Sequence, residues 1–375
     1  MNSAKPMASG LYSKRRLIRT LSSVVTAIAL LSWISTALAS GTTLWYQPSN
    51  GGTAGGTLPD FMQLLDPERK QSWSGAQRET DVLLLRANTL RMLEASRPGF
   101  IASSLAPFLA RTGMRLGLDS GVATFASCHK EGSSERRAKR ELEIMRRVEN
   151  AGIRISFMAL QSTLSKVQSR VIECPNYSVT ERIRDVVWYI STVRSGLAIH
   201  DGSLKFGLID ASVAKGGTWV QKNLGVPALE IAYERLFLAL ANEGLRLDFV
   251  LLDHPWEAIR EFSGRGRSSL TEIRDFQLWL EQQGVAPGFM LTSTKSVTER
   301  EFQERVLEVL AGLKRVHAPS SHFVLASWKR IPATELPESP ADPNKYPMTR
   351  VLKDIGIFLR GRDRNPAADP PKTPQ

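Results

Sequence analysis

The sequence contains few of the residues and motifs that support metal or nucleophilic chemistry. Its 375 residues include two cysteines and five histidines, and no pair of cysteines has the CxxC spacing of a zinc site. The GxSxG, HExxH and P-loop patterns are also absent. These absences argue against a zinc-binding module, a serine-hydrolase elbow and a nucleotide-binding loop. We therefore expect neither a metal ion nor a cofactor.

Long apolar runs are missing as well, apart from one near the N-terminus. The stretch Leu21–Ala39 carries no charge, and basic residues precede it (Lys14, Arg15, Arg16 and Arg19). Small residues at Ala37 and Ala39 fit the positions that signal peptidase reads, which predicts a signal peptide over residues 1–39, cleaved before Ser40. The alternative is an uncleaved membrane anchor. Cleavage predicts a periplasmic or secreted protein that meets the membrane through this segment alone.

The two cysteines, Cys128 and Cys174, are then expected in an oxidising compartment. There a cysteine pair is typical of a disulfide rather than of a metal site. A bridge between them would contribute about 4 kcal/mol in the chain-entropy model. Two free thiols are the alternative.

Short apolar runs alternate with longer helical stretches through the mature chain, and eight such runs can be counted. This alternation predicts an α/β fold, a single-domain (β/α)8 TIM-type barrel over residues 40–360. A doubly wound open sheet is the alternative, although no GxGxxG turn follows the first strand. Residues 361–375 are rich in proline and charge, which predicts a disordered tail. The expected strands are Thr43–Tyr46, Val82–Leu85, Met114–Leu118, Ile153–Leu160, Lys205–Ile209, Phe249–Leu252, Phe289–Leu291 and Phe323–Ala326.

Carboxylates follow several of these strands, at the end of a barrel where active sites lie. Asp119, Asp210 and Asp253 each close an apolar run, and Glu257 lies four residues beyond the last of them. Glycoside hydrolysis needs one protonated and one ionised carboxyl group on either side of the bond. We assign Asp253 or Glu257 as general acid and Asp119 or Asp210 as its partner. The alternative is that these side chains cap turns or helices.

Aromatic and basic side chains are predicted on the same rim. Stacking on sugar rings is one use for the aromatic residues, and core packing is the other. The basic residues are either an ordinary solvated face or a surface for an acidic ligand such as an anionic polysaccharide. The sequence Gly264–Arg267 is too short for an RG-rich segment, so no nucleic acid is expected. The predicted substrate-binding residues are Trp45, Tyr46, Gln161, His254, Trp256, Arg265, Arg267, Lys295 and Trp328.

The last strand supplies a family resemblance. Ser327-Trp328, followed by Pro332 and Leu336-Pro337-Glu338, resembles the closing strand of secreted bacterial glycoside-hydrolase-like (β/α)8 barrels. Strands that end in aspartate fit the same resemblance, which covers residues 43–359 in outline. It implies a carbohydrate substrate. In one respect the chain departs from the large group of retaining barrels, which keep glutamate at the ends of the fourth and seventh strands, because Gln161 and Thr292-Ser293 stand there.

These features together predict an exported glycoside hydrolase that acts on a polysaccharide. Two other readings remain open. One is a barrel that binds an anionic glycan without cleaving it, and the other is a metal- or phosphate-dependent barrel enzyme. New reducing ends distinguish the first from hydrolysis, and a chelator tests the second.

A disulfide between Cys128 and Cys174 predicts a response to reduction. Both cysteines follow neighbouring strands on the predicted active rim, so a bridge would brace that rim. Reduction should therefore lower the melting temperature and raise the mass of the purified chain by two hydrogens. An unchanged melting temperature together with an unchanged mass would contradict the bridge.

Overall fold

The computed structural model describes residues 41–49, 60–121, 133–161, 164, 178–197, 203–210, 228–262, 269–329 and 331–361. The predicted signal peptide and residues 362–375 of the predicted tail lie outside these residues, as do Cys128, Cys174, Arg265 and Arg267. Contacts divide the chain into Met1–Thr42 and Thr43–Gln375, and all the strands belong to the second unit. Among the described residues, no helix has the length and hydropathy that a membrane span requires.

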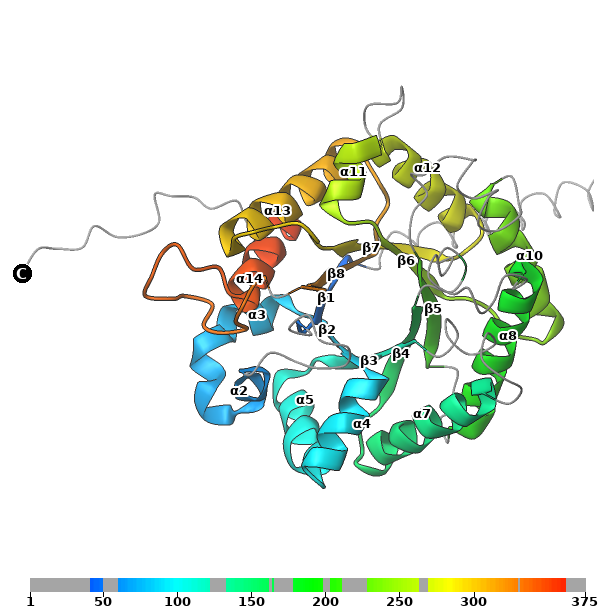
Figure 1. Ribbon diagram of the computed structural model, residues 1–375, viewed down its shortest axis with the longest axis horizontal. Helices are drawn as coiled ribbons and strands as arrows, with labels where there is room; N and C mark the ends of the chain where they lie inside the picture. Colours follow the sequence, from blue (N-terminus) through cyan, green and yellow to red (C-terminus); the bar gives the residue numbers. More distant parts are fainter. Residues whose placement is uncertain are drawn as a thin grey trace, which may run out of the picture. The chain divides into compact units, whose positions relative to one another are not determined.

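Eight parallel strands form a closed barrel in chain order, which confirms the predicted fold class (Figure 1). β1 pairs with both β2 and β8, and its register with β8 runs from Thr43 opposite His322 to Gln47 opposite Ala326. Each strand lies within a few residues of the expected run. The strands are β1 Thr43–Gln47, β2 Val82–Arg86, β3 Arg115–Ser120, β4 Ile155–Gln161, β5 Lys205–Asp210, β6 Phe249–Asp253, β7 Ala286–Leu291 and β8 His322–Ala326.

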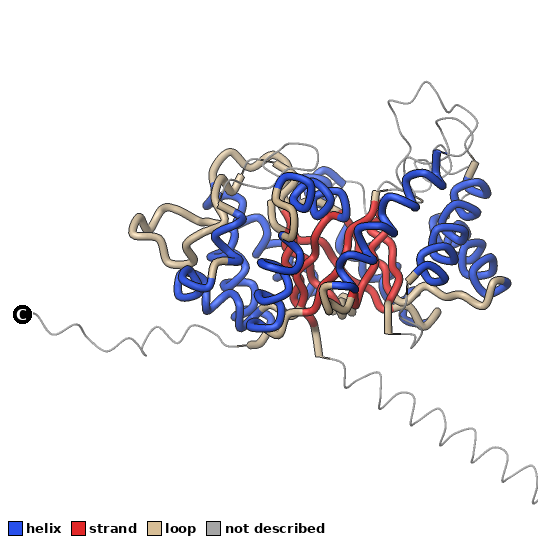
Figure 2. Tube along the Cα trace, turned by 90° about the horizontal axis from the view of Figure 1, so that it is seen from below, coloured by secondary structure: helices blue, strands red, loops and turns tan. Residues whose placement is uncertain are grey.

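Helices surround the strands, which lie at the centre of the described barrel (Figure 2). Two of the long ones end where glycine takes up a left-handed backbone: Gly152 closes α7 with φ +76° and Gly284 closes α12 with φ +74°. The helical elements are α2 Phe61–Leu65, η1 Pro67–Trp73, α3 Ser74–Glu79, α4 Ala87–Ser96, η2 Ile101–Leu105, α5 Ala106–Thr112, α7 Ser133–Asn150, α8 Val179–Gly196, α10 Leu229–Asn242, α11 Trp256–Phe262, α12 Ser269–Gln282, α13 Glu299–Arg315 and α14 Met348–Leu359.

Apolar side chains form two separate cores, one inside the barrel and one between the strands and the helices. The fully buried Trp45 lies at the centre of the inner core, with ring centroids 4.5 Å from Phe157 and 5.4 Å from Phe249. Gly207 makes room for this packing, because a Cβ there would lie 2.3 Å from the Phe249 ring. The barrel is therefore filled with side chains, so a ligand can reach the inward-facing residues from its ends alone.

A polar cluster closes the end of the barrel where the strands begin. The Thr43 hydroxyl lies 2.7 Å from Nδ1 of His322 and accepts a hydrogen bond from Nε1 of Trp45 at 2.8 Å. Burial, together with the charges of Lys205 and Arg115, lowers the pKa of His322 to about 4. The imidazole is therefore neutral in the folded protein at neutral pH.

This buried histidine predicts that stability depends on pH. The unfolded chain binds a proton at His322 as the pH falls below about 6.5, whereas the folded chain binds one there only near pH about 4. The free energy of unfolding should therefore fall by up to about 3 kcal/mol as the pH drops through this window. In His322→Asn the fall should be smaller by that amount, which urea unfolding at pH 7 and pH 4.5 measures. An identical fall in the two proteins would contradict the neutral imidazole.

Candidate active site at the carboxyl ends of the strands

A ring of polar side chains lies at the opposite end of the barrel, where the strands finish. Successive residues of a strand point to opposite faces, so the residue two positions beyond an inner-core residue also points inward. Trp45, Leu84, Ala159 and Leu251 belong to the inner core. The inward-facing residues at the ends of these strands are therefore Gln47, Arg86, Gln161 and Asp253, and Asp119 joins them from β3.

Asp119 is the most closely held member of this ring. Its side chain is almost fully buried, and its Oδ2 accepts a hydrogen bond of 2.9 Å from Nε2 of Gln47. The same oxygen lies 3.6 Å from Nε of Arg86. The Arg86 guanidinium in turn lies 4.8 Å from the ring centroid of Trp328. An adjacent guanidinium favours the ionised carboxylate, which suits a base or nucleophile.

Asp253, the last residue of β6, is half-buried at the same end of the barrel. Its register partner on β7 is Met290, an inner-core residue. β6 is separated from β3 by two strands around the barrel, so Asp119 and Asp253 approach the opening from different sides (Figure 1). His254, the next residue, is buried. The structure thus places two of the predicted carboxylates on one inward-facing rim.

Asp210 points the other way. It follows the inner-core residue Ile209, so its side chain lies on the helix-facing side of β5 with Leu208. Its Oδ2 accepts a hydrogen bond of 3.0 Å from the hydroxyl of Tyr233 on α10, and the residue is fully buried. Burial and the charge of Asp210 raise the pKa of Tyr233 well above its usual value. Asp210 therefore lies away from the inward-facing rim and bonds to a helix side chain, which is neither the predicted catalytic position nor a cap of a turn or helix.

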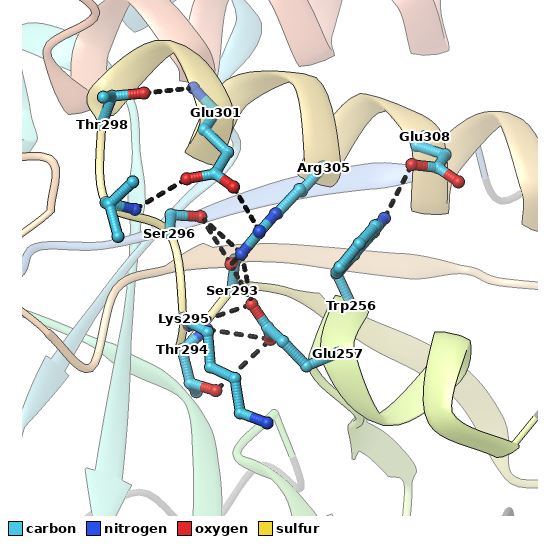
Figure 3. A network of polar contacts seen from close by, with 11 residues as sticks. Trp256, Glu257, Ser293, Thr294, Lys295, Ser296, Thr298, Glu301, Arg305 and Glu308 are labelled. Carbon is cyan, nitrogen blue, oxygen red and sulfur yellow. Dashed lines mark hydrogen bonds and ion pairs between the residues drawn. The ribbon is translucent and has the colours of Figure 1, made fainter.

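Glu257 anchors a loop (Figure 3). It lies in α11, and its carboxylate accepts hydrogen bonds from the Ser293 hydroxyl at 2.5 Å and from the backbone N–H groups of Thr294 at 3.0 Å and Lys295 at 2.9 Å. Nη1 of Arg305 on α13 completes the set at 2.8 Å. Burial alone would raise the pKa of Glu257, but these hydrogen bonds outweigh burial and lower it. A carboxyl group kept ionised is poorly suited to donate a proton.

Most of the predicted aromatic platform has another use. Trp45 is buried inside the barrel, and Tyr46 is buried on its outer side, where its hydroxyl bonds to Glu335. Trp256 packs between α11 and α13, with Nε1 donating to Glu308 at 2.7 Å and the Arg305 guanidinium 4.4 Å from its ring. Trp45 and Tyr46 follow the core-packing alternative, whereas Trp256 is half-buried against the outer core. Trp328 remains on the rim, half-buried and packed against the inner core.

The other predicted contacts divide in the same way. Gln161 is the half-buried last residue of β4, and Lys295 is exposed after β7 with its backbone held by Glu257.

Gln47 and Arg86 are the two rim residues that we did not predict. Each is a polar residue that ends an apolar strand, one position beyond the expected boundary, so the criterion that selected Asp119 would also have selected them. Among the described residues, no group of three or more His, Cys, Asp or Glu side chains could hold a metal ion.

Comparisons with known proteins add little to this geometry. No protein-family model and no curated protein matches the chain. Solved structures with a similar fold include a psychrophilic glycoside hydrolase family 10 endo-β-1,4-xylanase, with 11% identity, a TM-score of 0.47 and coverage of 85% of this chain and 98% of that one. A glucosidase from Croceicoccus marinus has 12% identity and a TM-score of 0.48 over 85% of this chain and 68% of that one. A xylose isomerase domain protein from Alicyclobacillus acidocaldarius has 14% identity and a TM-score of 0.43 over 85% and 98%.

The contacts of Glu257 predict a specific loss of stability. Glu257→Gln keeps the shape of the side chain but removes the charge that faces Arg305, so it should lower the free energy of unfolding by about 2 to 3 kcal/mol. Glu304→Gln is the matched control on α13, because Glu304 makes an exposed ion pair with Arg300 at 2.9 Å. The control should change stability by less than about 1 kcal/mol. Denaturant unfolding measures both, and equal effects would contradict the anchoring role.

Proposed function

We propose that this chain is an exported glycoside hydrolase, with Asp253 as general acid and Asp119 as the ionised partner. The observation that carries the proposal is that both carboxylates lie on the inward side of one barrel end, on strands β3 and β6. Glycoside hydrolysis requires two such groups with different protonation states. The Arg86 contact favours the charged form of Asp119.

The positions of the neighbouring residues support this pairing over others. Gln161 ends β4, and Thr292 and Ser293 follow β7, so the strand ends that carry glutamate in the retaining barrels hold no carboxylate here. Asp210 faces the helices and Glu257 anchors a loop. Asp119 and Asp253 are then the two inward-facing carboxylates among the described strand ends.

The charge of the rim supports an acidic polysaccharide as the substrate. Arg86 is stacked on Trp328, and the side chains of Lys295 and Lys329 are exposed in the loops that follow β7 and β8. A guanidinium on an aromatic face presents a planar donor edge that suits a sugar carboxylate. Trp328 supplies the one described aromatic ring on this rim, where it can pack against the C–H face of a sugar.

Conversion of either aspartate to asparagine tests the proposal. Asp253→Asn and Asp119→Asn should each lower the release of reducing ends from a cleaved polysaccharide by about 100-fold or more, because the chemistry loses its acid or its base. The mature chain, Ser40–Gln375, would be assayed on a panel of acidic and neutral bacterial polysaccharides. Circular dichroism would confirm that each variant is folded.

Asp275→Asn is the matched control, since Asp275 lies on the outer helix α12 in an exposed pair with Arg274. It should retain full activity. Full activity in Asp253→Asn would exclude Asp253 as the acid. No release from any polysaccharide, by a folded protein that still binds glycan with salt-dependent affinity, would instead favour a non-catalytic glycan-binding barrel.

A further inference from the structure

A cavity of about 740 Å³ lies at the end of the barrel where the strands begin, away from the candidate active site. Its walls come from α5, from the starts of β3 and β5, and from the turn between α7 and β4. This volume is in the usual range for small-ligand pockets. The amino ends of barrel strands ordinarily serve stability rather than catalysis, so a cavity there is a separate site.

Three cations line this cavity: Arg115, Arg154 and Lys205. Arg115 begins β3 and its guanidinium lies 5.0 Å from the ring centroid of Phe157, while Nε of Arg154 donates to the Ser203 hydroxyl at 2.9 Å. The Phe157 ring and the Ser203 hydroxyl are thus two of the groups that position these guanidinium groups. Among the described residues, no carboxylate lies within ion-pair distance of Arg115 or Lys205.

Two acids at this end of the described barrel have other hydrogen-bond partners. Asp81 accepts a hydrogen bond of 2.8 Å from the backbone of Leu44, and Asp248 accepts one of 2.9 Å from the backbone of Phe206. Neither of them lines the cavity. The positive field extends into the barrel, because Lys205 and Arg115 add to burial in lowering the pKa of His322. An anion bound beside these cations would relieve their mutual repulsion.

The wall formed by α5 is apolar. Small and aliphatic side chains of α5, with Ala102 before the helix and Met114 after it, line the cavity there, and the Arg115 guanidinium lies over the Phe157 ring. Sugars bind by stacking on open aromatic faces together with several polar groups, and this wall offers neither. It suits an alkyl or other aliphatic group. The apolar wall consists of Ala102, Ala106, Pro107, Leu109, Ala110 and Met114.

We propose that this cavity binds an amphiphilic anion, whose carboxylate or phosphate monoester lies against Arg115, Arg154 and Lys205 and whose apolar part lies against α5. The cations and the aliphatic wall face one hollow, so a ligand that carries both an anionic head and an apolar body satisfies both. The assignment does not depend on the chemistry at the opposite end of the barrel.

Calorimetric titration of the purified protein tests this site with four probes. Dodecyl phosphate and dodecanoate, below their micellar concentrations, carry both features; inorganic phosphate carries the head alone, and dodecyl maltoside carries the tail with a neutral head. At least one of the two anionic amphiphiles should bind saturably with one ligand per chain, and the comparison of the two identifies the preferred head group. The head alone and the neutral amphiphile should each bind at least tenfold more weakly.

Two variants and a control locate the binding. The double variant Arg154→Gln/Lys205→Gln should weaken binding of the preferred anion at least tenfold, and Ala110→Trp should do so by filling the apolar wall. Lys70→Gln, an exposed lysine of η1, is the control and should bind as the wild type does. Because the two charged side chains are exposed, the double variant should melt within a few degrees of the wild type.

Three results would overturn the proposal. They are the absence of binding by both anionic amphiphiles, equal binding of dodecyl maltoside or inorganic phosphate, and unchanged affinity in the folded double variant. None of these results bears on the release of reducing ends, so failure of this site leaves the proposed hydrolase untouched. Conversely, the Asp253→Asn variant should bind the amphiphile with the affinity of the wild type even where it has lost hydrolytic activity.

Discussion

The pairing of β1 with β8 is the constraint on which the rest of the structure depends. It closes the sheet, and closure gives every strand one face toward the barrel interior and one toward the helices. A strand residue then has two possible surroundings, and its position in the alternation decides between them. Asp119 and Asp253 lie on the inner face, whereas Asp210 lies on the outer face beside Tyr233. The same residue type at three strand ends thus has two roles.

The sequence predicted the barrel because its eight apolar runs are short, regularly spaced and bounded by helices that end at glycines such as Gly152 and Gly284. The direction of the strand-end side chains was harder to predict. Strands buried on both faces read as continuous apolar runs and carry little alternation from which the inner face could be identified. A shift of one residue reverses the direction of a side chain. Asp210 therefore looked equivalent to Asp119 in the sequence.

Long-range contacts account for the remaining differences. Glu257 was predicted as an acid from its place beside Asp253, but its partners Ser293 and Arg305 come from later in the chain. Nothing local to residues 253–257 reveals them. Trp45 was predicted on the rim, yet the register of β1 places it at mid-strand among Phe157 and Phe249. The sequence assigns Trp45 to the first strand, but its depth along the barrel axis depends on how the strands pack against one another.

The two ends of the barrel are chemically different because the filled interior separates them. At the carboxyl ends, cations are mixed with inward-facing carboxylates, and Arg86 is shared between Asp119 and Trp328. At the amino ends, Arg115 and Lys205 line a cavity to which the described residues contribute no carboxylate, and the charges of both lower the pKa of His322. Trp45 and its neighbours lie between these regions. The candidate active site and the proposed anion site are therefore separated by the packed interior of the barrel.

The loop anchored by Glu257 shows how a structural carboxylate serves the candidate site. α11 begins three residues after Asp253, and the backbone N–H of Trp256 donates to the carbonyl of Thr292 at 3.2 Å. The Glu257 carboxylate, on the same helix, accepts hydrogen bonds from the backbone N–H groups of Thr294 and Lys295, which follow Thr292 in the loop after β7. The segments after β6 and β7 are thereby joined by backbone hydrogen bonds next to the proposed acid. Catalysis requires such a group to stay in place while the bond breaks, and a fixed partner segment supplies that preorganisation without contributing a reacting group.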